Sequence, residues 1–192
     1  MSRVTTAYLL TCAAIGVAGG ILLIGTWWVS SVLFVTVPFV SVAVAGLWVV
    51  PAVVALRLIQ RPFAGLLVGL ISGLVLAPFF TVGAIATTLW WSFFPELPFL
   101  VTLYRRWSTG LHYAGALVVG IVYPFAAAES FDLWTMPLGA GIGFVALTIA
   151  SCLFGTWLGI LVAGRLRAAG VARLARRPAP AVPRTATDSD AA

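Results

Sequence analysis

Residues 90–99, WWSFFPELPF, place one carboxyl group, that of Glu96, inside an apolar run that extends over 83–104. If the run is a helix, Glu96 lies near the middle of a lipid bilayer. A charged group at that depth costs roughly 2.5–3.5 kcal/mol on insertion scales. Acidic side chains are therefore rare there, and those that occur bind ligands or pair with polar groups of neighbouring helices. This makes Glu96 the first candidate for a functional residue.

Two prolines, Pro95 and Pro98, flank this carboxyl group. Because proline has no amide hydrogen, the carbonyls of Trp91 and Phe94 lose their helical hydrogen-bond donors. Free carbonyls are tolerated at membrane depth only where polar partners are near. The carboxyl, the free carbonyls and the surrounding rings together predict a pocket for a small, flat, cationic or protonatable ligand. In the alternative interpretation, Glu96 is protonated and bonded to a neighbouring helix, and the prolines only kink the span.

The composition requires a bilayer around the whole chain. Hydrophobic residues make up 62% of it, charged residues 8%, and the mean hydropathy is +1.12, values that no water-soluble domain reaches. Long apolar runs without alternation favour helices over a β-barrel. We predict an all-α integral membrane domain over 7–166, preceded by a short N-terminus (1–6) and followed by a basic, then disordered, cytoplasmic tail (167–192). The six predicted spans are 7–25, 38–58, 63–79, 83–104, 111–128 and 137–162.

The basic residues predict the orientation. All of them are arginines, in short clusters between or after the apolar runs. With the N-terminus inside, six spans place every cluster in the cytoplasm, as the positive-inside rule requires. The net charge of +6 is therefore explained by topology, and we expect no nucleic-acid partner. Between the first two spans, we expect 26–37 to be a loop or a short re-entrant segment, and we expect Pro51 to kink the second span.

Small residues form two stripes at four-residue spacing. Ala14 and Ala18 share one face of the first span, and small residues so spaced let helices approach closely. In the third span, Gly65, Gly69 and Gly73 form a bare stripe. We interpret this second stripe as packing surface, with a pore lining as the alternative.

Catalysis finds little support in the sequence. The chain contains no lysine, which excludes a Walker A loop. His112 is its only histidine, and we expect it near the membrane interface. Cys12 and Cys152 are far apart and belong to no metal-binding pattern. We therefore expect no enzymatic activity, no catalytic residue, no metal site and no cofactor.

Binding is better supported, because aromatic residues gather in the outer half of the predicted topology. Their faces can hold a cation at about 0.5–2 kcal/mol per contact. Trp90 and Trp91 lie away from the helix face of Glu96, whereas Ser92 shares that face. Trp48 is interpreted as lipid-facing. The outer aromatic candidates are Trp27, Trp28, Trp90, Trp91, Tyr123 and Trp134.

Several stretches resemble YkoE-type proteins, the substrate-binding S components of energy-coupling-factor (ECF) transporters for thiamine or its hydroxymethylpyrimidine precursor. The similarity extends over about residues 7–175. The stretches that carry it are 10–18 (LTCAAIGVA), 96–99 (ELPF), 101–107 (VTLYRRW), 150–152 (ASC) and 164–166 (GRL).

The resemblance implies six helices in the bacterial cytoplasmic membrane and a vitamin site that opens outward. It also implies partners, namely a transmembrane coupling subunit, which Ala14 and Ala18 would contact, and two ATPase subunits. Glu96 would pair with the aminopyrimidine, since a carboxylate can accept two parallel N–H bonds. The aromatic residues would stack on the rings, and Glu129 or Asp132 would attract the cationic ligand at the mouth.

Two other functions remain open at this point. The chain is an S component for another small vitamin or metabolite, or it is a membrane scaffold that transports nothing. In the scaffold, Glu96 makes a structural hydrogen bond between helices.

Overall fold

The computed structural model describes residues 6–171, and all regular structure within them is helical. The prediction of an all-α membrane bundle is confirmed. Four helical segments are long and apolar enough to cross a membrane, namely 6–36, 38–59, 109–126 and 138–168. The elements are α1 (Thr6–Thr36), α2 (Pro38–Ser41), η1 (Val42–Val49), α3 (Val50–Ile59), α4 (Ala64–Phe80), α5 (Gly83–Val101), α6 (Thr109–Ala126), η2 (Leu133–Thr135) and α7 (Leu138–Ala168).

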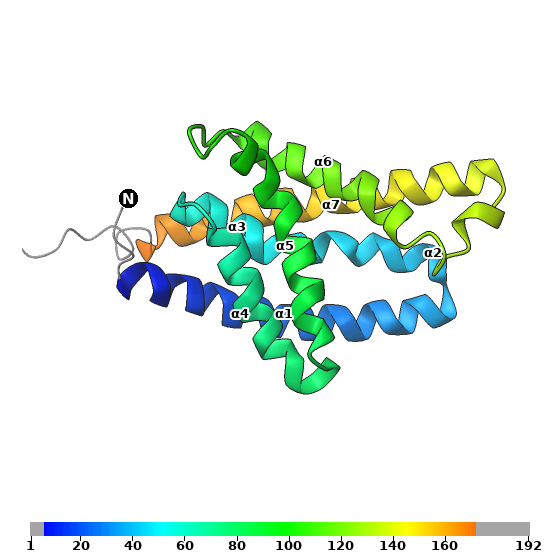
Figure 1. The fold of residues 1–192 in the computed structure, drawn as a ribbon, viewed down its shortest axis with the longest axis horizontal. Coiled ribbons are helices and arrows are strands. Elements are labelled where there is room, and N and C mark those ends of the chain that lie inside the picture. Colours follow the sequence, from blue (N-terminus) through cyan, green and yellow to red (C-terminus); the bar gives the residue numbers. More distant parts are fainter. Residues whose placement is uncertain (1–5, 172–192) are drawn as a thin grey trace, which may run out of the picture.

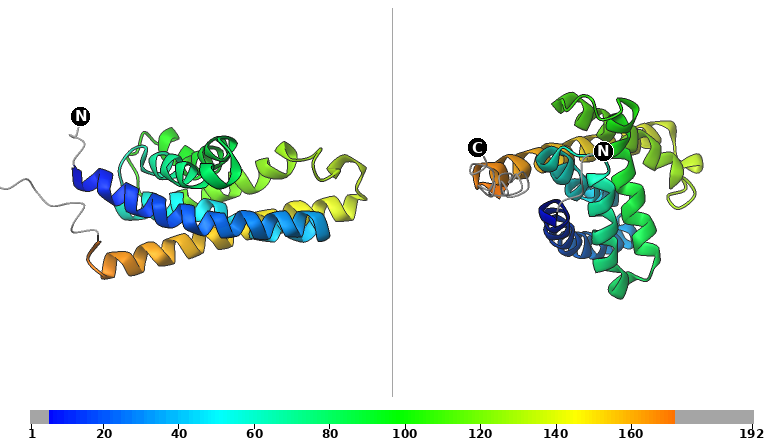
Figure 2. Two further views of the ribbon diagram at one scale, coloured as in Figure 1. Left: turned by 90° about the horizontal axis from the view of Figure 1, so that it is seen from below. Right: turned by 60° about the vertical axis from the view of Figure 1, so that its left-hand side comes forward.

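The helices run in two main directions (Figure 1). α1 and α7 follow the long axis of the molecule, whereas the α4–α5 hairpin crosses α1 steeply and is seen nearly end-on in the left view of Figure 2. The start of α1, the end of α7 and the loops after α3 and α5 lie at the same end of the molecule (Figure 1). The described arginines therefore share one end, which is the arrangement that the predicted cytoplasmic orientation needs.

The expected loop over 26–37 is wrong, because α1 continues as one helix of 31 residues to Thr36. The polar residues that suggested a loop are satisfied within the helix. Thr26, Ser31 and Thr36 each donate a hydrogen bond to the backbone carbonyl four residues earlier, at 3.0, 2.9 and 2.8 Å. Bonds of this kind let hydroxyl side chains remain in a helix at membrane depth.

The second span changes its winding before Pro51. Val42–Val49 form a 3-10 helix of eight residues, η1, between α2 and α3. Pro51 lies in the first turn of α3, where no intrahelical donor is required. A tighter segment therefore precedes Pro51, on its N-terminal side. Of the predicted tail, only the residues up to Val171 belong to the described part, and the rest lies outside it.

The glycine stripe of α4 is packing surface, as predicted, and lines no pore. α5 faces it with three polar side chains spaced four residues apart, which fill the room that side chains on α4 would need. The stripe therefore lets the two helices approach closely. Gly65 faces Glu96, Gly69 faces Ser92, and Gly73 faces Thr88.

Candidate functional site

A pocket of about 410 Å³ lies in the half of the molecule away from the arginines, between α1, η1, α5 and α6. Its wall is mostly aromatic, with hydroxyl groups at intervals. The lining residues are Trp27, Ser30, Ser31, Phe34, Val35, Ser41, Ala45, Trp48, Thr87, Trp91, Tyr123 and Phe131. We call this the aromatic pocket.

The rings of the pocket contact one another across four elements. Trp48 of η1 lies between Trp27 of α1, at 5.6 Å between ring centroids, and Trp91 of α5, at 6.2 Å. Tyr123 of α6 approaches Trp91 to 4.8 Å. Residues from four helical elements thus form one aromatic wall, and each ring is fixed by its neighbours. Such a wall can stack against a flat ligand and stabilise positive charge on it.

The hydroxyl groups of the pocket present oxygen acceptors. Ser31, Ser41 and Thr87 donate to backbone carbonyls of their own segments at 2.9, 2.6 and 3.1 Å. The hydroxyl hydrogen of each of these three residues is thereby used, while the lone pairs of its oxygen remain available as acceptors. No acidic or basic side chain is among the residues that line the pocket. The pocket therefore suits an aromatic ligand that carries N–H donors or a delocalised positive charge.

The structure brings together three of the predicted binding residues, Trp27, Trp91 and Tyr123, in this pocket. Trp90 packs beside it against Phe94, with 4.7 Å between the ring centroids.

The other candidates on the outer side lie outside the pocket wall. Trp28 and Trp134 are 60% and 71% exposed. Glu129 is exposed on the loop after α6, two positions before the pocket residue Phe131. Ser92 is buried against α4.

Glu96 lies apart from the aromatic pocket and holds two segments together. Its side chain is 2% exposed. One carboxyl oxygen accepts a hydrogen bond from the backbone N–H of Leu66 at 2.8 Å, and the other accepts from the hydroxyl of Tyr104 at 2.9 Å. Leu66 is in the first turn of α4, and the N-cap residue of this helix, Phe63, makes no side-chain cap. Glu96 therefore supplies the cap from α5.

Tyr104 is suited to this contact. It follows α5 in a turn where Leu103 and Tyr104 both have positive φ, at 51° and 56°. Burial raises the pKa of Tyr104, and the adjacent Glu96 carboxyl raises it further. The phenol therefore stays protonated at physiological pH and remains a donor. The contact is structural, as in the alternative interpretation, but both carboxyl oxygens of Glu96 accept hydrogen bonds, and the contact joins Glu96 to a loop as well as to a helix.

Replacing Glu96 separates a structural role from a binding role. For Glu96→Ala we expect stability to fall by about 1–3 kcal/mol, because the part-buried Leu66 N–H loses its acceptor. For Glu96→Gln, which keeps an acceptor of the same shape, we expect a smaller loss and an unchanged ligand affinity. Thermal unfolding and ligand titration of the purified variants measure the two effects. A glutamine variant of wild-type stability that no longer binds would instead support the direct pairing of Glu96 with the ligand.

Sequence reasoning missed Trp48, which was interpreted as lipid-facing but is 8% exposed at the centre of the aromatic wall. It also missed the hydroxyls of Ser31, Ser41 and Thr87. No periodic signal marks Trp48 or Ser41, because the second span is apolar all round and gives no preferred inner face.

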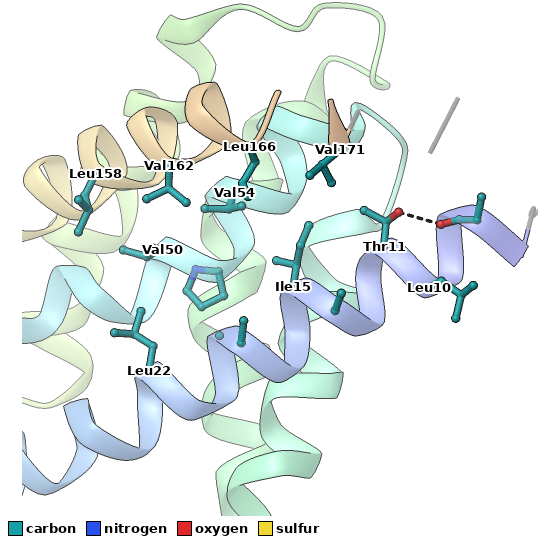
Figure 3. A pocket seen from close by; sticks show the side chains of 15 residues that line it. Leu10, Thr11, Ile15, Leu22, Val50, Val54, Leu158, Val162, Leu166 and Val171 are labelled. Atoms are coloured by element: carbon teal, nitrogen blue, oxygen red, sulfur yellow. Dashed lines mark hydrogen bonds between the residues drawn. The ribbon is translucent and has the colours of Figure 1, made fainter. Parts of the chain in front are cut away.

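A second depression, of about 940 Å³, runs between α1 and α7 with α3 as its floor (Figure 3). Its wall is almost entirely aliphatic. The predicted partner residues Ala14 and Ala18 line it and are exposed. Gly16 and Gly20, offset from them on α1, are instead buried against α4. The two sets of small residues therefore face different neighbours: one faces α4 and the other lines the depression. We call this depression the apolar groove.

The chain is similar to known proteins both in sequence and in fold. A family model described as "ABC-type cobalt transport system, permease component" matches residues 8–122, more than half of the chain. The chain belongs to this permease family. Among solved structures, one described as "Crystal structure of an S-component of ECF transporter" is similar to the permease with a TM-score of 0.78, at 16% sequence identity, over 89% of each chain. No curated protein matches the permease significantly.

The permease thus has the S-component fold that the resemblance implied, as a multi-pass membrane subunit of a transport family. The matches are to transport proteins and not to a catalytic family. The ligand is not given by the fold.

Proposed function

We propose that the permease is the substrate-binding subunit of a bacterial vitamin uptake transporter and binds thiamine or its hydroxymethylpyrimidine precursor in the aromatic pocket. The aromatic pocket carries this proposal. Its rings from α1, η1, α5 and α6 suit the flat pyrimidine, and its hydroxyl oxygens suit the exocyclic amine. Trp27, Trp91 and Tyr123 would stack on the ligand, and Glu129 would attract a cation at the mouth.

The family description names cobalt, which is a different kind of cargo. A bare cobalt ion needs several nitrogen, oxygen or sulfur ligands around one point. Within residues 6–171, no three His, Cys, Asp or Glu side chains come together in a group that could hold a metal ion. The aromatic pocket therefore favours an organic ligand.

Titration of the detergent-purified permease tests the proposal. Thiamine, hydroxymethylpyrimidine and Co²⁺ are added separately while tryptophan fluorescence and heat of binding are followed. We expect saturable quenching with at least one organic compound and none with Co²⁺. Binding of Co²⁺ alone would overturn the proposed ligand class. If neither compound binds but a different vitamin gives saturable quenching, the permease is an S component of other specificity. Binding of nothing at all would favour a scaffold.

The apolar groove is the proposed surface for the coupling subunit. Exposed small residues let a partner helix approach closely, and an aliphatic wall offers it packing surface. For Ala14→Leu and Ala18→Leu we expect co-purification of the coupling and ATPase subunits to fall at least severalfold, with ligand affinity unchanged. Gly25→Leu is the matched control, because Gly25 lies on the same helix and a Cβ added there would have no atom within 4 Å. Equal recovery of the partners in all three variants would contradict this assignment.

A further inference from the structure

The 3-10 segment η1 is unusual for its length. It has eight residues, whereas runs of more than three or four are uncommon, and a 3-10 stretch within a helix often marks a functional position. η1 contributes Ala45 and Trp48 to the wall of the aromatic pocket. Contacts outside η1 are therefore needed to stabilise the 3-10 winding, and these contacts also determine the shape of the aromatic pocket.

The side chain of Ser151, on α7, inserts into the backbone of η1. Its hydroxyl oxygen accepts a hydrogen bond from the Gly46 N–H at 2.8 Å and donates one to the Ala43 carbonyl at 2.7 Å. In an α-helix, the Gly46 N–H would donate to the carbonyl of Val42. In a 3-10 helix it would donate to the carbonyl of Ala43, which Ser151 also bonds, so the hydroxyl bridges the two groups of one 3-10 pair and keeps the Gly46 N–H from its α-helical acceptor. A side chain inserted into the ladder is one of the known causes of a local change in helix geometry.

The backbones of η1 and α7 touch at this level, which leaves the serine little freedom. A side chain at Gly46 would overlap the backbone of Ser151, and one at Gly155 would overlap Gly46. Ser151 is 8% exposed. Its hydroxyl is thus held in place by close packing on both sides and can act as a fixed clamp.

The winding of η1 decides where Trp48 points. A 3-10 helix turns about 120° per residue and an α-helix about 100°. Over the six steps from Val42 to Trp48, the two windings therefore differ by roughly 120°. Rewinding η1 as an α-helix would turn the Trp48 ring away from Trp27 and Trp91, between which it now lies.

We propose that Ser151 is a positioning residue of the aromatic pocket: its hydroxyl holds η1 in the 3-10 winding and thereby keeps Trp48 in the pocket wall. The part of this inference that concerns ligand affinity rests on the proposed function. The part that concerns Trp48 does not, because it is a property of the permease without ligand.

The test follows Trp48 directly, by ¹⁹F NMR of permease labelled with 5-fluorotryptophan, with the Trp48 resonance assigned through Trp48→Phe. We expect Ser151→Ala to move or broaden this resonance in the absence of ligand. Ser72→Ala is the matched control. Ser72 is also a buried serine that donates to a backbone carbonyl of another helix, that of Gly16 at 2.9 Å, but this carbonyl belongs to α1 and not to η1. Its variant should leave the Trp48 resonance unchanged.

Ligand titration of the same variants forms the second arm. With the organic compound that the wild type binds, Ser151→Ala should lose about tenfold in affinity, as expected for one displaced aromatic contact, and Ser72→Ala should lose little. An unchanged Trp48 resonance in Ser151→Ala overturns the inference, whatever the affinities are. A wild type that binds neither compound overturns the proposed function, while the NMR arm still decides the role of Ser151.

If Ser151→Ala does not fold, Ser151→Thr and Ser151→Cys replace it. Threonine keeps a hydroxyl at this position, whereas cysteine offers only a weak donor and acceptor. We expect the threonine variant to keep the Trp48 resonance and the cysteine variant to shift it. Equal shifts in both would show that packing, and not the hydroxyl, positions Trp48.

Discussion

Gly155→Ala is expected to destabilise the permease more than any other single methyl group added to α7. A Cβ at this position would overlap the backbone of Gly46 on η1. Backbone atoms cannot swing aside as the end of a flexible side chain can, so the helices must separate. Overpacking of this kind costs about 1–3 kcal/mol, which corresponds to a fall of roughly 2–12 °C in melting temperature for a chain of this size.

The control for this prediction is on the same helix. Gly164→Ala adds the same methyl group where no atom lies within 4 Å. Alanine is the better helix former, so this variant should melt at or slightly above the wild-type temperature. Thermal unfolding in one detergent compares the two variants. Identical melting temperatures would show that η1 and α7 are not in backbone contact.

Trp27→Ala is expected to give the largest loss of ligand affinity. Trp27 lines the aromatic pocket, stacks on Phe80 with 4.6 Å between ring centroids, and contacts Trp48 edge-on. It is therefore held rigidly, as aromatic residues that dominate binding commonly are. Removing such a residue costs about 2 kcal/mol or more, or roughly 30-fold in Kd. Isothermal titration with the ligand that the wild type binds measures this loss.

The adjacent residue provides the control. Trp28 belongs to the same helix and is 60% exposed, outside the pocket wall. Trp28→Ala should change the affinity less than threefold, although sequence alone suggests both tryptophans as binding residues. A larger loss from Trp28 than from Trp27 would place the ligand outside the aromatic pocket.

Sequence reasoning reached the parts of this structure that depend on composition and on helix geometry. The apolar runs predicted the helices, and the arginines predicted which helix ends lie together. The spacing along α5 correctly placed Ser92 on the face of Glu96 and placed Trp91 on another. These predictions need only one helix at a time.

The features that sequence reasoning missed depend on two helices at once. The winding of η1 arises where Ser151 of α7 meets Gly46, some hundred positions earlier, and no pattern within the second span reveals it. Trp48 was placed toward lipid for the same reason. Nor does the sequence show that His112, in the first turn of α6, is 1% exposed, with its ring against Phe99 of α5 at 4.8 Å. The hydroxyls over 26–37 suggested a loop because the sequence does not show that they bond back to their own helix.

The lengths of α1 and α7 bear on how the permease sits in lipid. Each has 31 residues and is therefore about 46 Å long, whereas the hydrocarbon core of a bilayer is about 30 Å thick. Hydrophobic mismatch of this size is relieved by tilt or by local thickening of the bilayer. The α4–α5 hairpin crosses α1 steeply (Figure 1), so inclining α1 brings the hairpin closer to the membrane normal. A thinner membrane therefore favours a more strongly inclined α1, and the hairpin stands more upright when α1 leans in the plane that the two share.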